Sequence, residues 1–257
     1  MRFSRKLCIA TVATALMGSV AIGSHADRAD AYAGDPVVIV AGTFAGQPLA
    51  NIFYAPLAAR LQADGRQAFI FGLPGSGLGD AAAAAADLNA FVDGVRAQTG
   101  AAKVDLIGHS QGGMVSRYYI KYLGGASEVD SMISLGAVHY GTLAANAASL
   151  LGLGNCIGVI ACQQMSIGST FLNNLNAGDD TIGNVQYTNF VTSLDTVIVP
   201  FTNGFLANDG NNKNVTIQTQ CWLKYVDHVS LPLDGTVYSG IRDALAKRTI
   251  WLNCFAL

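Results

Sequence analysis

The chain has 257 residues, of which 51% are hydrophobic and 12% charged, and its formal net charge at pH 7 is −2. This length allows one α/β domain with a full hydrophobic core, and the mildly acidic balance does not favour nucleic-acid binding. No group of residues has the sequence spacing of metal ligands, so we assign no metal ligand and predict no cofactor, and the sequence leaves a structural cation open.

Residues 1–33 have the pattern of a secretory signal peptide. A basic start is followed by an apolar segment over residues 7–22 and then by small residues. Cleavage is expected after Ala26 or Ala33. A membrane anchor is the alternative, but the apolar segment is short for a bilayer span. We therefore expect a secreted, extracellular protein with no stable membrane span, whose residues 34–257 form a single domain.

The region beyond the leader contains an even number of cysteines, which in an exported protein indicates two disulfide bonds. The four residues are Cys156, Cys162, Cys221 and Cys254. Three pairings are possible, and we favour Cys156 with Cys162 and Cys221 with Cys254. The second bond would tie the C-terminal tail to the segment before His228 and would stabilise the fold by roughly 3 to 4 kcal/mol.

Strand-like and helix-like segments alternate along the first hundred residues. The apolar runs are short and continuous, as expected of parallel strands buried on both faces. The predicted segments are a strand at 36–41, a glycine-rich loop at 42–46, a helix at about 51–63, a strand at 67–73, and a helix from Asp80 to Gly100. This alternation predicts a mostly parallel sheet with helices on both faces, which is an α/β fold.

Residues 104–113 read Val-Asp-Leu-Ile-Gly-His-Ser-Gln-Gly-Gly and predict a strand, a tight turn and a helix. In this setting, Gly-x-Ser-x-Gly is typical of a nucleophile elbow, a strained turn that raises a serine hydroxyl above the sheet. A side chain at Gly108 or Gly112 would strike the neighbouring strand or helix. The alternative is an ordinary turn that happens to contain Ser110.

The second half of the chain continues the alternation of strands and helices, apart from one unusual uncharged segment. Residues 143–165 carry no charge, and they are compatible either with a cap or acyl-groove segment or with ordinary core helices. The predicted segments are a strand at 131–135, a cap segment at about 143–176 that ends in a short helix at 168–176, a strand at 185–191, a last strand at 215–220, and a final helix that includes Ile241.

Three candidate catalytic residues follow predicted strands. A serine hydroxyl needs a neighbouring base, and the base needs a carboxylate that orients it. Ser110, Asp195 and His228 occur in the chain order serine, acid, histidine. Because the carboxyl ends of parallel strands meet at one edge of a sheet, these residues can converge there. Backbone N–H groups of Thr43 and Gln111 are the predicted donors of an oxyanion hole.

Other residues compete for these roles. His139 also follows a strand and remains an alternative base, whereas His109 is expected to point away from Ser110 and His25 lies near the cleavage point. Four other aspartates are less suitable as the acid, because three have the sequence context of turns and one directly precedes the base. They are Asp179, Asp180, Asp209 and Asp227.

These motifs resemble those of the secreted bacterial triacylglycerol lipases of the class-2 group. The resemblance rests on Gly108–Gly113, Gln164-Met165 followed by Gly168–Leu172, Tyr187-Thr188 followed by Asp195 and Pro200, and Asp227-His228. The chain is also similar to fungal lipase B. That similarity rests on Gly42-Thr43, Thr188-Asn189 with Asp195, Asn214-Val215 continuing to Cys221, and Asp227-His228.

Together the matches span about residues 37–245, and they imply an α/β-hydrolase fold. They also imply the catalytic residues named above, Thr43 and Gln111 in the oxyanion hole, and closure of the C-terminal tail by a disulfide at Cys221. Many class-2 relatives carry His-Gly where this chain has Ala41-Gly42, and the cap segment matches neither group closely.

The sequence therefore predicts a secreted serine carboxylic-ester hydrolase, with a triacylglycerol lipase that works through an acyl-enzyme as the first choice. An ester or lipid substrate is the expected partner, and a lipid–water interface is one place where it can be presented. A short-chain carboxylesterase or an acyltransferase would use the same residues. A non-catalytic binding protein on the same scaffold is the remote alternative.

Overall fold

A parallel β-sheet forms the centre of the structure, which is a computed structural model that describes residues 34–150, 155–208 and 210–257. The predicted signal peptide and both of its cleavage points lie outside the described residues. Within those residues the sheet has six strands in the order β2-β1-β3-β4-β5-β6, and every pair is parallel. The strands are β1 (Val37–Val40), β2 (Ala68–Phe71), β3 (Val104–His109), β4 (Val129–Leu135), β5 (Gln186–Val191) and β6 (Asn212–Thr216).

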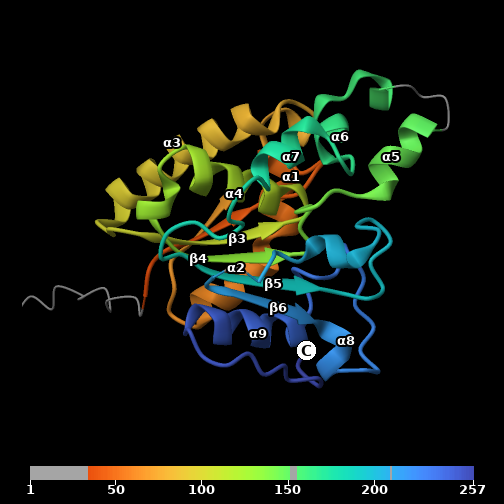
Figure 1. Cartoon of the computed structure of the whole chain (residues 1–257). Helices are drawn as coiled ribbons and strands as arrows, with labels where there is room; N and C mark the ends of the chain where they lie inside the picture. Colours follow the sequence, from red (N-terminus) through yellow and green to blue (C-terminus); the bar gives the residue numbers. More distant parts are fainter. Residues whose placement is uncertain (1–33, 151–154, 209) are drawn as a thin grey trace, which may run out of the picture. The chain divides into compact units, whose positions relative to one another are not determined.

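Helices cover both faces of this sheet. They are α1 (Gln47–Phe53), α2 (Ala55–Ala63), α3 (Ala81–Thr99), α4 (Gln111–Tyr122), α5 (Leu143–Leu150), α6 (Ile160–Met165), α7 (Thr170–Leu175), α8 (Ile217–Gln220) and α9 (Gly235–Leu245). Figure 1 shows α3 and α4 above the sheet and α9 below it. The alternation of strands and helices predicted from the sequence is confirmed.

Side chains of alternate strand residues pack into two separate hydrophobic cores, one on each face of the sheet. Val38 and Val40 of β1 pack with apolar side chains of α3 and α4, whereas Val37 and Ile39 pack with those of α2 and α9. All four side chains are fully buried. A strand enclosed on both faces can use β-branched residues at every position, which explains its unbroken apolar sequence.

The long helix α3 begins and ends where the sequence indicates. The side chain of Asp80 accepts a hydrogen bond from the Ala82 N–H at 2.8 Å, which satisfies one of the free donors of the first turn. Gly100 ends the helix in the left-handed conformation, with φ of 71°.

The helix predicted at about 51–63 begins earlier than expected and is broken in two. It starts at Gln47 and is interrupted at Tyr54, because Pro56 lies in the first turn of α2 and has no backbone N–H to continue the preceding helix. Tyr54 at this break is only 1% exposed. The interruption therefore directs a tyrosine side chain into the protein interior.

The last strand was predicted at 215–220, which is wrong. Strand β6 covers Asn212–Thr216, and Ile217–Gln220 is the short helix α8. Among the described strands β6 pairs only with β5, so it lies at an edge of the sheet, where its polar residues can face solvent. Its sequence therefore lacks the continuous apolar run that identifies the central strands, and the apolar residues Val215 and Ile217 suggested a later start.

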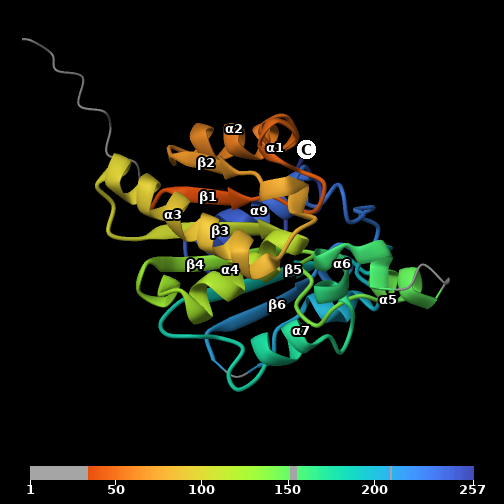
Figure 2. The ribbon, with the colours of Figure 1, turned by 90° about the horizontal axis from the view of Figure 1, so that it is seen from above.

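The described part of the cap segment consists of α5, α6 and α7, and residues 151–154 lie outside the description. Figures 1 and 2 show α5 and α6 beyond the carboxyl ends of the strands. A disulfide joins Cys156 to Cys162 within this segment, and a second joins Cys221 to Cys254. The favoured pairing of the four cysteines is the pairing in the structure. No described helix is long and apolar enough to cross a bilayer.

Three glycines let β3 and α4 approach the neighbouring backbone. A Cβ at Gly112 would lie 2.3 Å from the carbonyl oxygen of Val40, and one at Gly108 would lie 2.7 Å from the Cα of Gly113. A Cβ at Gly113 would lie 2.3 Å from the Cβ of Ala137. Because the obstructing atoms belong to backbone or to a buried neighbour, no side-chain rotation relieves these contacts.

Replacement of Gly112 by alanine should therefore destabilise the protein by about 3 kcal/mol or more, because the backbone of β1 must move. The matched control is Gly94→Ala in the exposed middle of α3, where no atom lies within 4 Å of the added Cβ. That change should stabilise the protein by about 0.5 to 1 kcal/mol. Urea unfolding measures both values, and equal stability of the two variants would contradict the steric explanation.

Candidate active site

Ser110 occupies the turn between β3 and α4. Its φ of 54° and ψ of −125° place a residue with a side chain in a region of backbone space that favours glycine. The Ser110 N–H donates to the carbonyl oxygen of Leu135 at 3.0 Å, which fixes the turn against β4. The hydroxyl-bearing side chain lines a pocket at the carboxyl ends of the strands.

His228 and Asp195 come together from two loops that are 33 residues apart in sequence. His228 Nδ1 lies 2.8 Å from Asp195 Oδ2, and both side chains are buried. The other oxygen of Asp195 accepts hydrogen bonds from the N–H groups of Val197 and Ile198, at 2.8 and 2.7 Å. The carboxylate is therefore held on one side by the backbone and can orient the imidazole with the other oxygen.

The predicted nucleophile and the predicted base face the same pocket. Ser110 and His228 both contribute to its wall. The hydrogen bonds among the described residues do not include one between Ser110 Oγ and His228 Nε2. Such catalytic hydrogen bonds are often long or poorly aligned until substrate is bound.

His139, the alternative base, lies elsewhere. It is fully buried, and its Nε2 contacts Ser134 Oγ at 2.9 Å and Asn189 Oδ1 at 3.1 Å. Burial holds the pKa of His139 well below its usual value, so the ring stays neutral. It is not among the residues that line the pocket.

Two of the rival acids, Asp227 and Asp180, have other partners. Asp227 accepts hydrogen bonds from the N–H and hydroxyl of Ser230, at 2.8 and 2.6 Å, which shapes the turn after His228 and lowers the pKa of Asp227. Asp180, which the sequence suggested was a turn residue, is buried and pairs with Arg117 of α4 at 2.8 Å. His25 and Asp209 lie outside the described residues.

The two predicted oxyanion donors lie side by side. The Thr43 hydroxyl donates to Gln111 Oε1 at 2.8 Å, which joins the glycine-rich loop to the first turn of α4. In the same loop the N–H groups of Gly42 and Phe44 have acceptors, at Tyr54 and Ser76. Neither the Thr43 nor the Gln111 N–H has an acceptor among the described residues. Two backbone donors are therefore free beside the serine, as stabilisation of an oxyanion requires.

Sequence reasoning missed the role of two residues next to this site. His109 lines the same pocket as Ser110, its Nδ1 lies 2.8 Å from the Tyr54 hydroxyl, and its Nε2 lies 3.0 Å from the carbonyl oxygen of His228. Tyr54 lies within the helix predicted at about 51–63, and that prediction gives its hydroxyl no role. The contacts join residues 55 and 119 positions apart, and no local pattern signals them.

The pocket has a volume of about 660 Å³, and most of its wall is apolar. Leu49 and Phe53 of α1 form part of the wall, and Val159 and Met165 belong to the cap segment. The disulfide between Cys156 and Cys162 also faces it. Polar groups are concentrated around Ser110, so the site joins one reactive centre to an apolar cavity.

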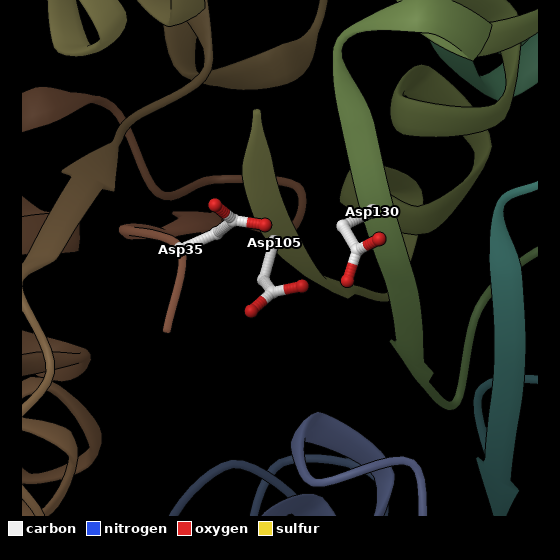
Figure 3. Close-up of side chains that lie close together, drawn as sticks. All are labelled: Asp35, Asp105 and Asp130. Atoms are coloured by element: carbon white, nitrogen blue, oxygen red, sulfur yellow. The ribbon is translucent and has the colours of Figure 1, made fainter. Parts of the chain in front are cut away.

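Three carboxylates at the opposite, amino-terminal edge of the sheet are close enough to hold a metal ion. The ligand atoms of Asp35, Asp105 and Asp130 lie within 4.8 Å of one another, and Figure 3 shows the side chains coming together from three neighbouring segments. Cations of the chain already pair with two of them: Arg66 lies 3.2 Å from Asp105, and Lys247 lies 2.7 Å from Asp130. These pairs offset the charge of two of the three carboxylates.

Comparison with known proteins finds similarity to the α/β-hydrolase fold and, over part of the chain, to bacterial lipases. A family profile described as "alpha/beta hydrolase fold" matches residues 35–152. A triacylglycerol lipase of Burkholderia plantarii is 33% identical over 141 residues, which are 53% of this chain and 39% of the relative. A triacylglycerol lipase of Pseudarthrobacter phenanthrenivorans is 35% identical over 119 residues, which are 44% of this chain and 37% of the relative. The matches thus span about two fifths of the curated relatives' length.

Solved structures extend the likeness to most of the chain. Lipase B of Aspergillus fumigatus superposes with a TM-score of 0.69 at 18% identity, over 83% of this chain and 52% of its own. The mature form of a Bacillus licheniformis lipase superposes with a TM-score of 0.64 at 18% identity, over 83% of this chain and 92% of its own. At this level of identity the likeness establishes the arrangement of the backbone.

The acidic cluster predicts a pH dependence of stability. Burial raises the pKa of Asp105 to about 7, against about 4 in an unfolded chain. Between these values the folded state binds the proton more tightly, so the contribution of Asp105 to stability falls as the pH rises from 4 to 7. The Asp105→Asn variant cannot titrate there, and its Tm relative to the parent should rise between pH 5 and pH 7.5.

Thermal melts of the parent and the variant at both pH values measure this difference. Asp87→Asn, at an exposed position on α3, is the control and should show no such trend. A constant Tm difference for Asp105→Asn across the range would contradict the raised pKa.

Proposed function

We propose that this chain, which has the α/β-hydrolase fold and is related to bacterial triacylglycerol lipases, is a secreted serine ester hydrolase that acts on lipid esters. The observation that carries this proposal is the contact between His228 Nδ1 and the buried Asp195 carboxylate in the pocket that Ser110 lines. A buried imidazole oriented by a carboxylate beside a strained serine is the arrangement that acyl transfer requires.

Each group has one role in the proposed reaction. His228 Nε2 accepts the proton of the Ser110 hydroxyl as the serine oxygen attacks the ester carbonyl carbon. The Thr43 and Gln111 N–H groups donate to the oxyanion that forms. The carbon–oxygen bond to the alcohol then breaks, and the alcohol leaves with the proton from His228. A water molecule then attacks the carbonyl carbon of the acyl-enzyme in the same way, with His228 accepting its proton, and the carboxylic acid is released.

The apolar pocket supports an acyl chain as the group that is bound. Several large side chains both line the pocket and remain exposed at its mouth, including Phe44 at 70%, Leu49 at 51% and Val229 at 55%. An apolar rim around an apolar cavity favours substrate presented at a lipid–water interface. The names of the curated relatives, which are triacylglycerol lipases, point in the same direction.

Two observations support secretion. The first 33 residues have the composition of a signal peptide, and both disulfides require an oxidising compartment. In the proposed mature protein, residues 34–257 form one catalytic domain in which residues at about 143–176 cap the pocket.

Ser110→Ala should lower kcat for ester hydrolysis roughly a million-fold, because no other group can form the acyl-enzyme. Ser116→Ala is the control. It removes a buried hydroxyl from the same helix, where Ser116 donates to the carbonyl oxygen of Gly112 and does not line the pocket. Turnover of p-nitrophenyl butyrate by both purified variants, with circular dichroism to verify folding, measures the effect. Substantial turnover by folded Ser110→Ala would overturn the proposal.

Acyl-chain length tests the assignment of the pocket. If the chain is buried among apolar side chains, kcat/KM should rise about four-fold for each added methylene, since each buried methylene contributes about 0.8 kcal/mol. A series of p-nitrophenyl esters from acetate to octanoate, kept below their aggregation limits, measures this trend. A maximum at acetate would show instead that the pocket does not bind the acyl chain.

A further inference from the structure

A hydrogen-bonded path connects the loop of Thr43 with the loop of His228. The Gly42 N–H donates to the Tyr54 hydroxyl oxygen at 2.9 Å, that hydroxyl lies 2.8 Å from His109 Nδ1, and His109 Nε2 lies 3.0 Å from the His228 carbonyl oxygen. Tyr54 is 1% exposed and His109 is 6% exposed. Because water hardly reaches these side chains, a lost partner would leave a buried polar group unsatisfied.

The partners permit only one arrangement of protons along the path. A carbonyl oxygen can only accept, so His109 Nε2 carries the hydrogen that is donated to His228. In the neutral ring Nδ1 is then the acceptor, and the Tyr54 hydroxyl donates to it. The tyrosine oxygen in turn accepts from Gly42, so every donor on the path has an acceptor.

Protonation of His109 would break this arrangement. A hydrogen on Nδ1 would compete with the Gly42 N–H for the Tyr54 oxygen and would leave the tyrosine hydrogen without its acceptor. Burial lowers the pKa of His109 to about 3, and the nearby His228 lowers it further in the same direction. The neutral ring, and with it the path, therefore persists over the range in which His228 must act as a base.

Both ends of the path lie beside the reacting groups. Gly42 directly precedes Thr43, and a Cβ at Gly42 would lie 3.1 Å from the Ser110 Cβ. The other end fixes the backbone of His228, from which the proposed base projects. The rings of His109 and His228 have centroids 5.0 Å apart. A shift at either end would thus displace an oxyanion donor or the base relative to Ser110.

We propose that Tyr54 and His109 are positioning residues that hold the loop of residues 42–46 and the backbone of His228 in one fixed relation to Ser110. This inference rests on the proposed function. Both residues also line the pocket, but their polar atoms are occupied within the path, so in this proposal they act through Gly42 and His228. The oxyanion donor and the base lie on different loops, and the path fixes their positions relative to each other.

The first test is Tyr54→Phe, which keeps the ring in the core and removes only the hydroxyl. It leaves the Gly42 N–H and His109 Nδ1 without their partner. The expected result is a kcat for p-nitrophenyl butyrate that falls between about 10-fold and 100-fold, with KM within about two-fold of the parent, because the misplaced groups act in the transition state. A merely structural role would lower the Tm without this division between kcat and KM.

Tyr119→Phe is the matched control. Tyr119 is also fully buried, its hydroxyl donates to Glu128 at 2.6 Å, and neither residue belongs to the path or lines the pocket. This variant should lose a similar amount of thermal stability and keep the parent kcat. A kcat for Tyr54→Phe equal to that of Tyr119→Phe would overturn the inference.

Two replacements of His109 provide an independent test. His109→Phe removes both nitrogens and should lower kcat at least as much as Tyr54→Phe, whereas His109→Gln retains a donor for the His228 carbonyl and should recover several-fold of the loss. The double variant Tyr54→Phe/His109→Phe should be no slower than His109→Phe alone, because both changes break the same path. Equal kcat for the Gln and Phe variants would overturn the role of the His109 donor.

Ser110→Ala in the same assay separates the possible failures. If Ser110→Ala is inactive and Tyr54→Phe is fully active, the proposed function stands and the positioning role is overturned. If Ser110→Ala is active, the proposed function itself fails. If His109→Phe does not fold, Tyr54→Phe and its Tyr119→Phe control decide the question alone.

Discussion

Close packing of backbone against backbone at residues 108–113 is the constraint on which the active site depends. Gly112 lies against the carbonyl oxygens of β1, and Gly113 lies against Ala137 after β4. Helix α4 can therefore start directly at the end of β3, and Ser110 is left in a strained turn with φ of 54°. Two fully buried cores above and below the sheet stabilise that turn, so the strain is localised at the serine that the proposed reaction uses.

Groups from three separate loops must be aligned with this serine, and buried hydrogen bonds achieve the alignment. Two backbone N–H groups hold Asp195, which in turn holds the imidazole of His228. Tyr54 and His109 connect the backbone of His228 to the loop that precedes Thr43. The polar contacts of the site are thus concentrated around the reacting atoms, while the cap segment and α1 supply an apolar wall. This division suits a substrate with a polar ester and an apolar chain.

The sequence predicted those features that local patterns encode, and the α/β fold is confirmed. Buried strands, the cap at Asp80 and the serine turn each depend on a few adjacent residues. The predicted boundary of β6 is wrong because an edge strand has a polar sequence. The break at Tyr54 is not predicted because the helical spacing of apolar residues continues across Pro56. The ion pair of Arg117 with Asp180 and the path through His109 were also missed, since they join residues 63 and 119 positions apart. The catalytic roles of Ser110, Asp195 and His228 stay predictions.

Formation of a covalent acyl-enzyme at Ser110 is the central claim, and mass spectrometry after reaction with an alkyl p-nitrophenyl phosphonate tests it most directly. The phosphonate stands in for the tetrahedral intermediate and stays attached to the nucleophile. The intact protein should gain the mass of one phosphonyl group, peptide mapping should place that group on Ser110, and Ser110→Ala should remain unlabelled. A protein that gains no mass, or that carries the group on another residue, would contradict the claim.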